Sequence, residues 1–271
     1  MLGPRSYLSA SLLALSLAAI GYAPASRNQS SPAESTRKPV LVELFTSEGC
    51  SDCPPADTLL QKLDALQPVH DAEIIPIEEH VDYWNQGGWY DPYSSHDWTA
   101  RQMIYTPTTD KTGPYTPEMV VDGEAKFVGS NGRKALDAIQ QAAARPETEI
   151  AITPSGPAEK NSRDFTVSVG KLDGDTSGDT AEVWLAVTQD GLHSSVSRGE
   201  NAGRSLTHIA TLRSLHKIGD IKSASDAATF TDHPRVKFDS HWDAANLHVI
   251  VFVQERKSHQ VIGVASVKLA G

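Results

Sequence analysis

Two cysteines that lie between a short apolar run and an amphipathic helix constrain this chain more than any other feature. Cys50 and Cys53 follow Val40–Phe45, an apolar run typical of a buried strand. They precede Pro54–Leu66, whose leucines share one helical face and whose prolines fall in the first turn, where a missing N–H costs little. This spacing predicts a small-ring disulfide at a helix start, where unpaired N–H groups favour the thiolate. We expect Cys50 to be the more exposed, attacking thiol and Cys53 to be the inward thiol that resolves the mixed disulfide.

The same pair allows other interpretations. One is an inert structural disulfide, although so short a loop removes little chain entropy. Another is a Cu(I)-binding or delivery protein, because two thiolates and the nearby His80 suit a soft ion. A third is a non-catalytic binding module. Asp52 and Glu48 bring negative charge to the pair, which opposes thiolate formation, so the motif Cys50-Ser51-Asp52-Cys53 does not distinguish a reductase, an oxidase and an isomerase.

The first 25 residues have the pattern of a secretory signal peptide. Arg5 precedes the apolar core Leu8–Ile20, and Ala23-Pro24-Ala25 provides small residues for cleavage. This core is shorter than the roughly 20 residues of a spanning helix, so we expect no stable membrane insertion. Residues 26–38 are polar and predict a flexible tether. The sequence therefore indicates export to the periplasm or beyond, where the thiols meet an oxidising compartment.

The charge balance argues against one class of partner. The chain has 34 acidic and 24 basic residues and a formal net charge of −10, which disfavours binding to phosphate backbones. We expect no nucleic-acid partner. The histidines form neither an HxH nor an HExxH pattern, so no metal ligands are predicted apart from the Cu(I) alternative. We likewise expect no cofactor other than the redox-active disulfide itself.

Two segments follow the tether. Residues 39–146 predict the order β-α-β-α-β-β-α, from Val40–Phe45 to an alanine-rich helix at Arg133–Ala144. This order, with the cysteine pair after the first strand, resembles the thioredoxin fold. Residues 147–271 alternate apolar and polar positions between Gly/Ser/Asp-rich turns, which is typical of a mostly antiparallel, sandwich-like β domain. The predicted fold class is therefore α/β, with a thioredoxin-like domain followed by a β-rich domain.

The thioredoxin resemblance implies roles for residues outside the pair. Thr116-Pro117 stands before the third strand, where such proteins have a cis-proline that lies against the cysteines and holds the substrate chain. Glu43 is the nearest match to their buried acid, offset by one position, and could accept the proton of Cys53; a solvated Glu43 at a strand edge is the alternative. His80 and Trp84 follow the second strand and are candidates for lining the substrate cleft. Arg101 is expected to pair with a carboxylate or to be solvated.

A closer resemblance covers nearly the whole mature chain. The sequence is similar to a family of secreted bacterial thioredoxin-like proteins catalogued as domain of unknown function 1223. The motifs that carry this resemblance are VELFTSEGCSDCPPADTLL, HVDYWNQGGWYDPYSSHDWTARQMIY, YTPEMVVDGEAKFVGS, SRGENAGRSLTH and Val249–Ala265. It implies the fold and export but no established activity. From the site we predict a thiol–disulfide oxidoreductase that acts on protein or small-molecule disulfides and thiols, with a redox partner that the sequence does not identify.

Overall fold

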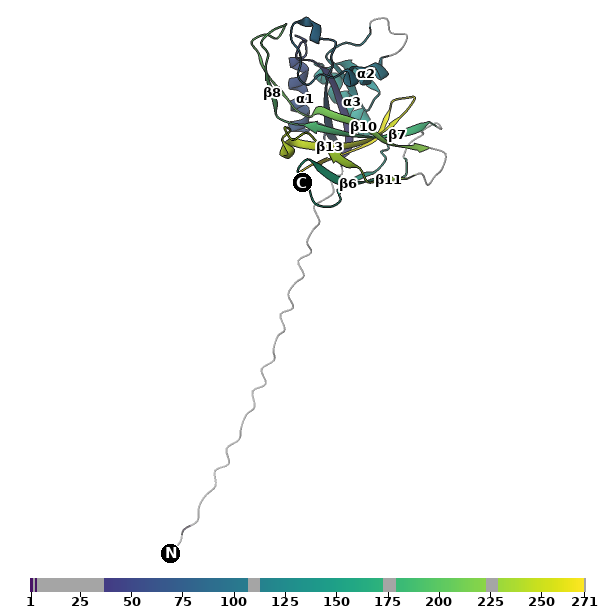
Figure 1. Ribbon diagram of the computed structural model, residues 1–271. Helices are drawn as coiled ribbons and strands as arrows, with labels where there is room; N and C mark the ends of the chain where they lie inside the picture. Colours follow the sequence, from purple (N-terminus) through teal and green to yellow (C-terminus); the bar gives the residue numbers. More distant parts are fainter. Residues whose placement is uncertain (2, 4–36, 107–112, 173–178, 223–228, 271) are drawn as a thin grey trace. The chain divides into compact units, whose positions relative to one another are not determined.

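A computed structural model describes residues 1, 3, 37–106, 113–172, 179–222 and 229–270 (Figure 1). The predicted signal peptide, residues 1–25, lies outside the described residues except for Met1 and Gly3, and so does the predicted tether up to residue 36. Residues 35–271 form one compact unit. Among the helices of the described ranges, none is both long and apolar enough to cross a membrane.

The segment that contains the cysteines has the predicted order of strands and helices. Its elements are β1 (Lys38–Thr46), α1 (Pro54–Leu66), β2 (Ala72–His80), the 3-10 turn η1 (Asn85–Gly87), α2 (His96–Tyr105), β3 (Glu118–Val121), β4 (Ala125–Val128) and α3 (Gly132–Ala143). The helix α1 begins and ends at the predicted residues. The turn between β3 and β4 places Asp122 and Gly123 at positive φ, as a tight hairpin requires.

Strands dominate the rest of the chain. They are β5 (Ile150–Pro154), β6 (Ser162–Val169), β7 (Thr180–Gln189), β8 (Leu192–Ser195), β9 (Ser205–His208), β10 (Thr211–Lys222), β11 (Phe230–Asp232), β12 (Arg235–Lys237), β13 (Leu247–Glu255) and β14 (Val261–Lys268), with the 3-10 turn η2 (Ala244–Asn246) before β13. Apolar and polar residues in β10 do not follow a clean period of two because the strand has two register shifts against β7.

One eight-stranded sheet runs through both predicted segments. Its order is β14-β13-β7-β10-β2-β1-β3-β4, so strands from either side of residue 146 are hydrogen-bonded to one another. The junction is the parallel pair β2 and β10, which meet at Glu78 and Thr211. A smaller sheet of β11, β6, β12 and β5 packs its apolar side against β7 and β13. The fold is a mixed α/β fold in which a large sheet is the main body.

The helices cover the two faces of the sheet near β1. Val42 and Leu44 of β1 pack with α1 and α3. Leu41 lies on the opposite face in a cluster that includes Trp98 of α2. Because side chains alternate along a strand, Glu43 shares the α2 face with Leu41, whereas Thr46 shares the α1 face with Leu44. In Figure 1 the β8–β9 hairpin reaches along α1, and helix α1 does contact β9.

Candidate functional site

The cysteine pair forms a disulfide at the start of α1. Cys50 and Cys53 are bonded, with their Cα atoms 5.4 Å apart. Cys53 is the N-cap residue of α1, and its side chain makes no capping hydrogen bond. The backbone N–H groups of Ala56 and Asp57 both donate to the carbonyl of Cys53. The small-ring disulfide at a helix start that the spacing predicts is therefore present.

The expected exposure of Cys50 is wrong, because a loop of the β-rich segment covers the disulfide. Cys50 is 1% exposed and Cys53 is fully buried. The connection between β8 and β9 inserts Asn201, whose side-chain amide donates to the carbonyls of Glu48, at 2.9 Å, and of Cys50, at 2.8 Å. The neighbouring Glu200 accepts a hydrogen bond from the Ser51 N–H at 3.1 Å. This loop lies more than 140 residues further along the chain, with sequence separations of 149 to 153 in these contacts.

The loop that carries the disulfide is flanked by Trp84, Thr116 and Pro117. The Thr116-Pro117 peptide is cis, as predicted. The Trp84 indole N–H donates to the Thr116 hydroxyl at 2.7 Å. A β-carbon at Gly49 would lie 3.1 Å from that of Trp84, so Trp84 packs directly on the residue before Cys50. Three of the residues predicted to bind substrate are thus together beside the disulfide.

Glu43 lies elsewhere. It is fully buried, which excludes the solvated alternative, but its carboxylate points into the α2 face of the sheet. Arg101 of α2 donates to it at 2.6 Å, and the Tyr105 hydroxyl donates at 2.7 Å. Of the two expectations for Arg101, pairing with a carboxylate and exposure to solvent, the structure confirms the first. Because α1 packs on the other face, the structure does not bring Glu43 to Cys53.

A different buried acid lies on the cysteine side. Asp57 is one helical turn after Cys53, at the i,i+4 spacing that places two side chains on one helix face. The Thr46 hydroxyl, at the end of β1, donates to its carboxylate at 2.7 Å. Burial, assisted by the negative charge of Glu78, raises the pKa of Asp57 to about 7. Asp57 is thus able to exchange a proton near neutral pH.

His80 belongs to a buried polar cluster behind the disulfide loop. Its Nδ1 lies 2.7 Å from an Asp91 carboxylate oxygen, which also accepts the Glu48 N–H at 2.8 Å. Its Nε2 faces a Glu78 oxygen at 3.6 Å and has no hydrogen-bond partner. Glu78 and His80 are two positions apart on β2, so both side chains point to the same face.

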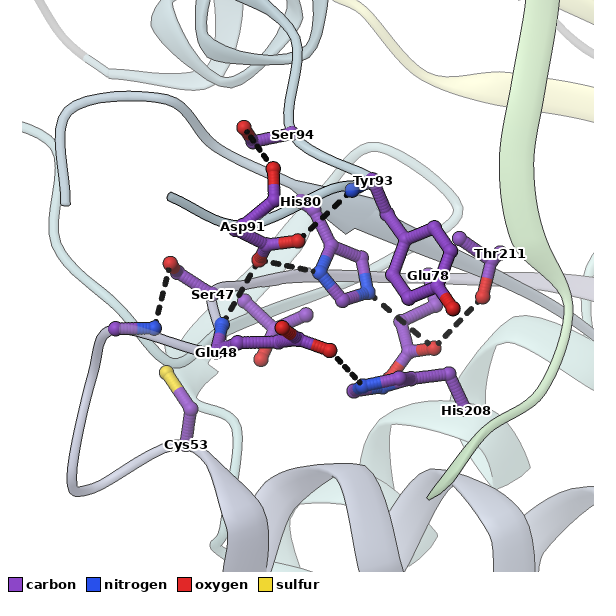
Figure 2. Close-up of polar contacts among 12 residues, drawn as sticks. Ser47, Glu48, Cys53, Glu78, His80, Asp91, Tyr93, Ser94, His208 and Thr211 are labelled. Carbon is purple, nitrogen blue, oxygen red and sulfur yellow. Dashed lines mark hydrogen bonds and ion pairs between the residues drawn. The ribbon is translucent and has the colours of Figure 1, made fainter. Parts of the chain in front are cut away.

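His208, at the end of β9, completes this cluster (Figure 2). Its Nδ1 lies 3.2 Å from Glu78 and its Nε2 lies 3.1 Å from Glu48. The His80 and His208 rings meet edge to face, with centroids 4.6 Å apart. The half-buried ring of Tyr93 packs edge-on against both imidazoles. The cluster joins β2, the disulfide loop and the β8–β9 hairpin.

The carboxylates of the cluster favour positive charge on the imidazoles. Burial by itself lowers the pKa of His80, but the carboxylates of Asp91 and Glu78 outweigh it and raise that pKa well above its usual range. Burial likewise lowers the pKa of His208, whereas Glu78 and Glu48 raise it to about 9. Burial raises the pKa of Glu78, and the two imidazoles lower it to about 2. The carboxylates of the cluster thus stabilise cationic imidazoles despite their burial.

Comparison with known proteins places the chain in a family. The family described as "protein of unknown function (DUF1223)" matches residues 41–254. The chain belongs to this family. No protein of curated function matches it. A solved protein structure from Agrobacterium tumefaciens is similar, with a TM-score of 0.61 and 22% identity over 87% of this chain and 96% of that one. HBP35 of Porphyromonas gingivalis has a TM-score of 0.63 and 18% identity over 87% of this chain and 76% of that one. At these identities the likeness shows the fold alone.

The sequence of this family member predicts a site role for His80 but for few other residues of the polar cluster. Glu78 is not among the predicted site residues, although a Glu-x-His pattern at the end of an apolar strand places both side chains on one face. Asp57 had a local signal too, its spacing of four from Cys53. No local pattern pointed to Asp91 or His208, because each reaches the cluster through a loop or hairpin.

Proposed function

We propose that this protein is an exported, thioredoxin-like thiol–disulfide oxidoreductase that uses the Cys50–Cys53 pair. The observation that carries the proposal is the disulfide at the N-terminus of α1, where helix N–H groups stabilise a thiolate. The strand order β2-β1-β3-β4 and the position of Pro117 support it. Pro117 and Ala56, in the first turn of α1, each approach the empty β-position of Gly129 to 3.2 Å, so they are neighbours.

The exchange proceeds in two balanced steps when the reduced pair meets a substrate disulfide. The Cys50 thiolate attacks one substrate sulfur, the substrate S–S bond breaks, and one substrate thiolate leaves. The Cys53 thiolate then attacks Cys50, which releases the second substrate thiolate and restores the Cys50–Cys53 disulfide. The substrate gains the two electrons that the pair loses. We assign to Asp57 the acceptance of the Cys53 proton, in place of Glu43.

The covering loop adds a condition to this chemistry. Because Cys50 is buried under Asn201, a protein or small-molecule substrate reaches it only when the β8–β9 connection moves aside. Trp84 and Thr116, which flank the disulfide loop, then line the exposed groove. The redox direction follows from the reduction potential of the pair, measured by equilibration with glutathione.

An insulin-reduction assay tests the proposal. Cys50→Ser is expected to abolish turnover, whereas Ser51→Ala, a matched change inside the same loop, is expected to retain it. Asp57→Asn is expected to slow turnover by about tenfold or more and to change its pH profile, as loss of a general base does. A Cys50→Ser protein that reduces insulin at the wild-type rate would refute the proposal.

A further inference from the structure

We infer that Glu78, His80 and His208 form a binding site for a divalent transition-metal ion, with Zn²⁺ as the best match, behind the disulfide loop. One carboxylate oxygen and one nitrogen from each ring lie within 4.8 Å of one another, and all three residues are buried. This site uses no cysteine. It is therefore distinct from Cu(I) binding by the thiols and independent of the proposed redox function.

The spacing of the donor atoms suits a small tetrahedral ion. Zn–N and Zn–O bonds of about 2.0–2.2 Å place neighbouring ligand atoms of a tetrahedron about 3.3–3.6 Å apart. His80 Nε2 lies 3.6 Å from Glu78 Oε2 and His208 Nδ1 lies 3.2 Å from Glu78 Oε1, so each imidazole faces a different oxygen of this carboxylate at about the required separation. Two imidazoles and one carboxylate are a ligand set that Zn²⁺ accepts, with the fourth position left for water or another ligand.

Each imidazole is already oriented for an ion by a carboxylate on its far nitrogen (Figure 2). Asp91 holds His80 at Nδ1, so that Nε2 faces Glu78. Glu48 holds His208 at Nε2, so that Nδ1 faces Glu78. A carboxylate on the outer nitrogen is the usual partner of a metal-bound histidine, because it sets the tautomer and raises the basicity of the inner nitrogen.

The His80 nitrogen that faces Glu78 makes no hydrogen bond, and its contact with the Glu78 carboxylate is long, at 3.6 Å. His80 Nε2 is fully buried and has no hydrogen bond, although buried ring nitrogens in native proteins are nearly always paired. The cluster also contains more acidic than basic groups. Its three buried carboxylates belong to Glu48, Glu78 and Asp91, and it has only two imidazoles. A divalent cation among them satisfies both the open nitrogen and the excess of negative charge.

Tyr93 is a half-buried residue that contacts both imidazoles. Its half-buried ring packs against His80, with centroids 5.5 Å apart, and against His208, with centroids 5.7 Å apart. The Glu48 backbone belongs to the loop before Cys50 and donates to Asp91, so the cluster is hydrogen-bonded to the segment that carries the disulfide.

The test is titration of the oxidised mature protein with Zn²⁺ against a chromophoric chelator, together with the visible spectrum of the Co²⁺-loaded protein. We expect tetrahedral Co²⁺ bands without sulfur-to-metal charge transfer. His208→Gln is expected to lower Zn²⁺ affinity at least about 100-fold, and Asp91→Asn about 10–100-fold. His241→Gln is the matched control, because His241 forms an exposed pair with Asp239 at 2.7 Å.

Comparison of the Zn²⁺ affinities of two variants distinguishes binding at this cluster from binding at the cysteines. Unchanged Zn²⁺ affinity in the Cys50→Ser/Cys53→Ser protein supports the site, whereas loss of affinity in that protein and not in His208→Gln overturns it. Should His208→Gln fail to fold, the Co²⁺ spectrum of the wild-type protein decides alone. No tetrahedral spectrum, or Zn²⁺ affinity no greater than that of folded His208→Gln, shows that the cluster holds protons only.

Discussion

Glu43, which was expected to accept the proton of Cys53, instead forms a buried ion pair with Arg101. The substitution Arg101→Leu tests this pair. The Arg101 side chain is 5% exposed, and it contacts Glu43 at 2.6 Å and Glu79 at 3.4 Å. It also donates to the Tyr105 hydroxyl at 3.0 Å and stacks on Phe252 of β13, with its guanidinium carbon 5.0 Å from the ring centroid. Removing it leaves two buried carboxylates without their cation.

The expected loss is large for one substitution. Breaking a buried ion pair from one side costs about 3–5 kcal/mol. For a chain of this size each kcal/mol lowers Tm by about 2–4 °C, so we expect Tm to fall by about 6–20 °C. The matched control is Arg235→Leu, because Arg235 pairs with Asp164 and Glu159 at 2.8 and 2.7 Å but is 47% exposed. Solvent screens that pair, so its loss has a much smaller effect.

Urea unfolding followed by tryptophan fluorescence measures both variants, with the slope m as a check on two-state behaviour. The Glu43→Leu/Arg101→Leu protein is expected to be more stable than Arg101→Leu alone, because replacing both partners removes the uncompensated charge. Burial is the largest cause that raises the pKa of Glu79 well above its usual range, and it persists in the double variant, which has also lost the Arg101 charge that lowers this pKa, so the remaining acid stays neutral. The reasoning is refuted if Arg101→Leu unfolds at the same urea concentration as Arg235→Leu.

Three further predictions concern pH, access and packing. Burial raises the pKa of Asp122 to about 8 from its ordinary value of 3.8, so the folded protein retains a proton that the unfolded chain loses. The free energy of unfolding therefore declines as pH rises from about 4 through about 8, and in urea titrations the Asp122→Asn protein should become more stable relative to wild type across that window. Asn201→Ala removes the cover of Cys50 and should speed disulfide reduction by dithiothreitol about tenfold, whereas an unchanged rate would show that the loop does not control access. Gly123→Ala places a β-carbon 1.8 Å from the His259 carbonyl at φ +72°, so a clear fall in Tm is expected, and a Tm equal to that of wild type would contradict the packing.

The parts of the site that could be predicted from the sequence are those set by neighbours along the chain. The disulfide and the start of α1 depend on residues within one helical turn of Cys53. The buried acid shows where such reasoning ends. Glu43 matched the thioredoxin pattern with an offset of one, but an offset of one in a strand turns the side chain to the opposite face. The acid on the cysteine side is Asp57, which comes from the helix instead.

The sequence by itself determined the local chemistry of this protein: a cysteine pair after an apolar strand, a helix that starts with prolines, and a Thr-Pro peptide before the third strand. Only the tertiary structure decided what surrounds that chemistry. His208 and Glu78 are 130 residues apart and meet because β10 pairs with β2. Asn201 covers Cys50 from 151 residues away for the same reason. Such contacts depend on strand pairing across the whole chain, and no short pattern encodes that pairing.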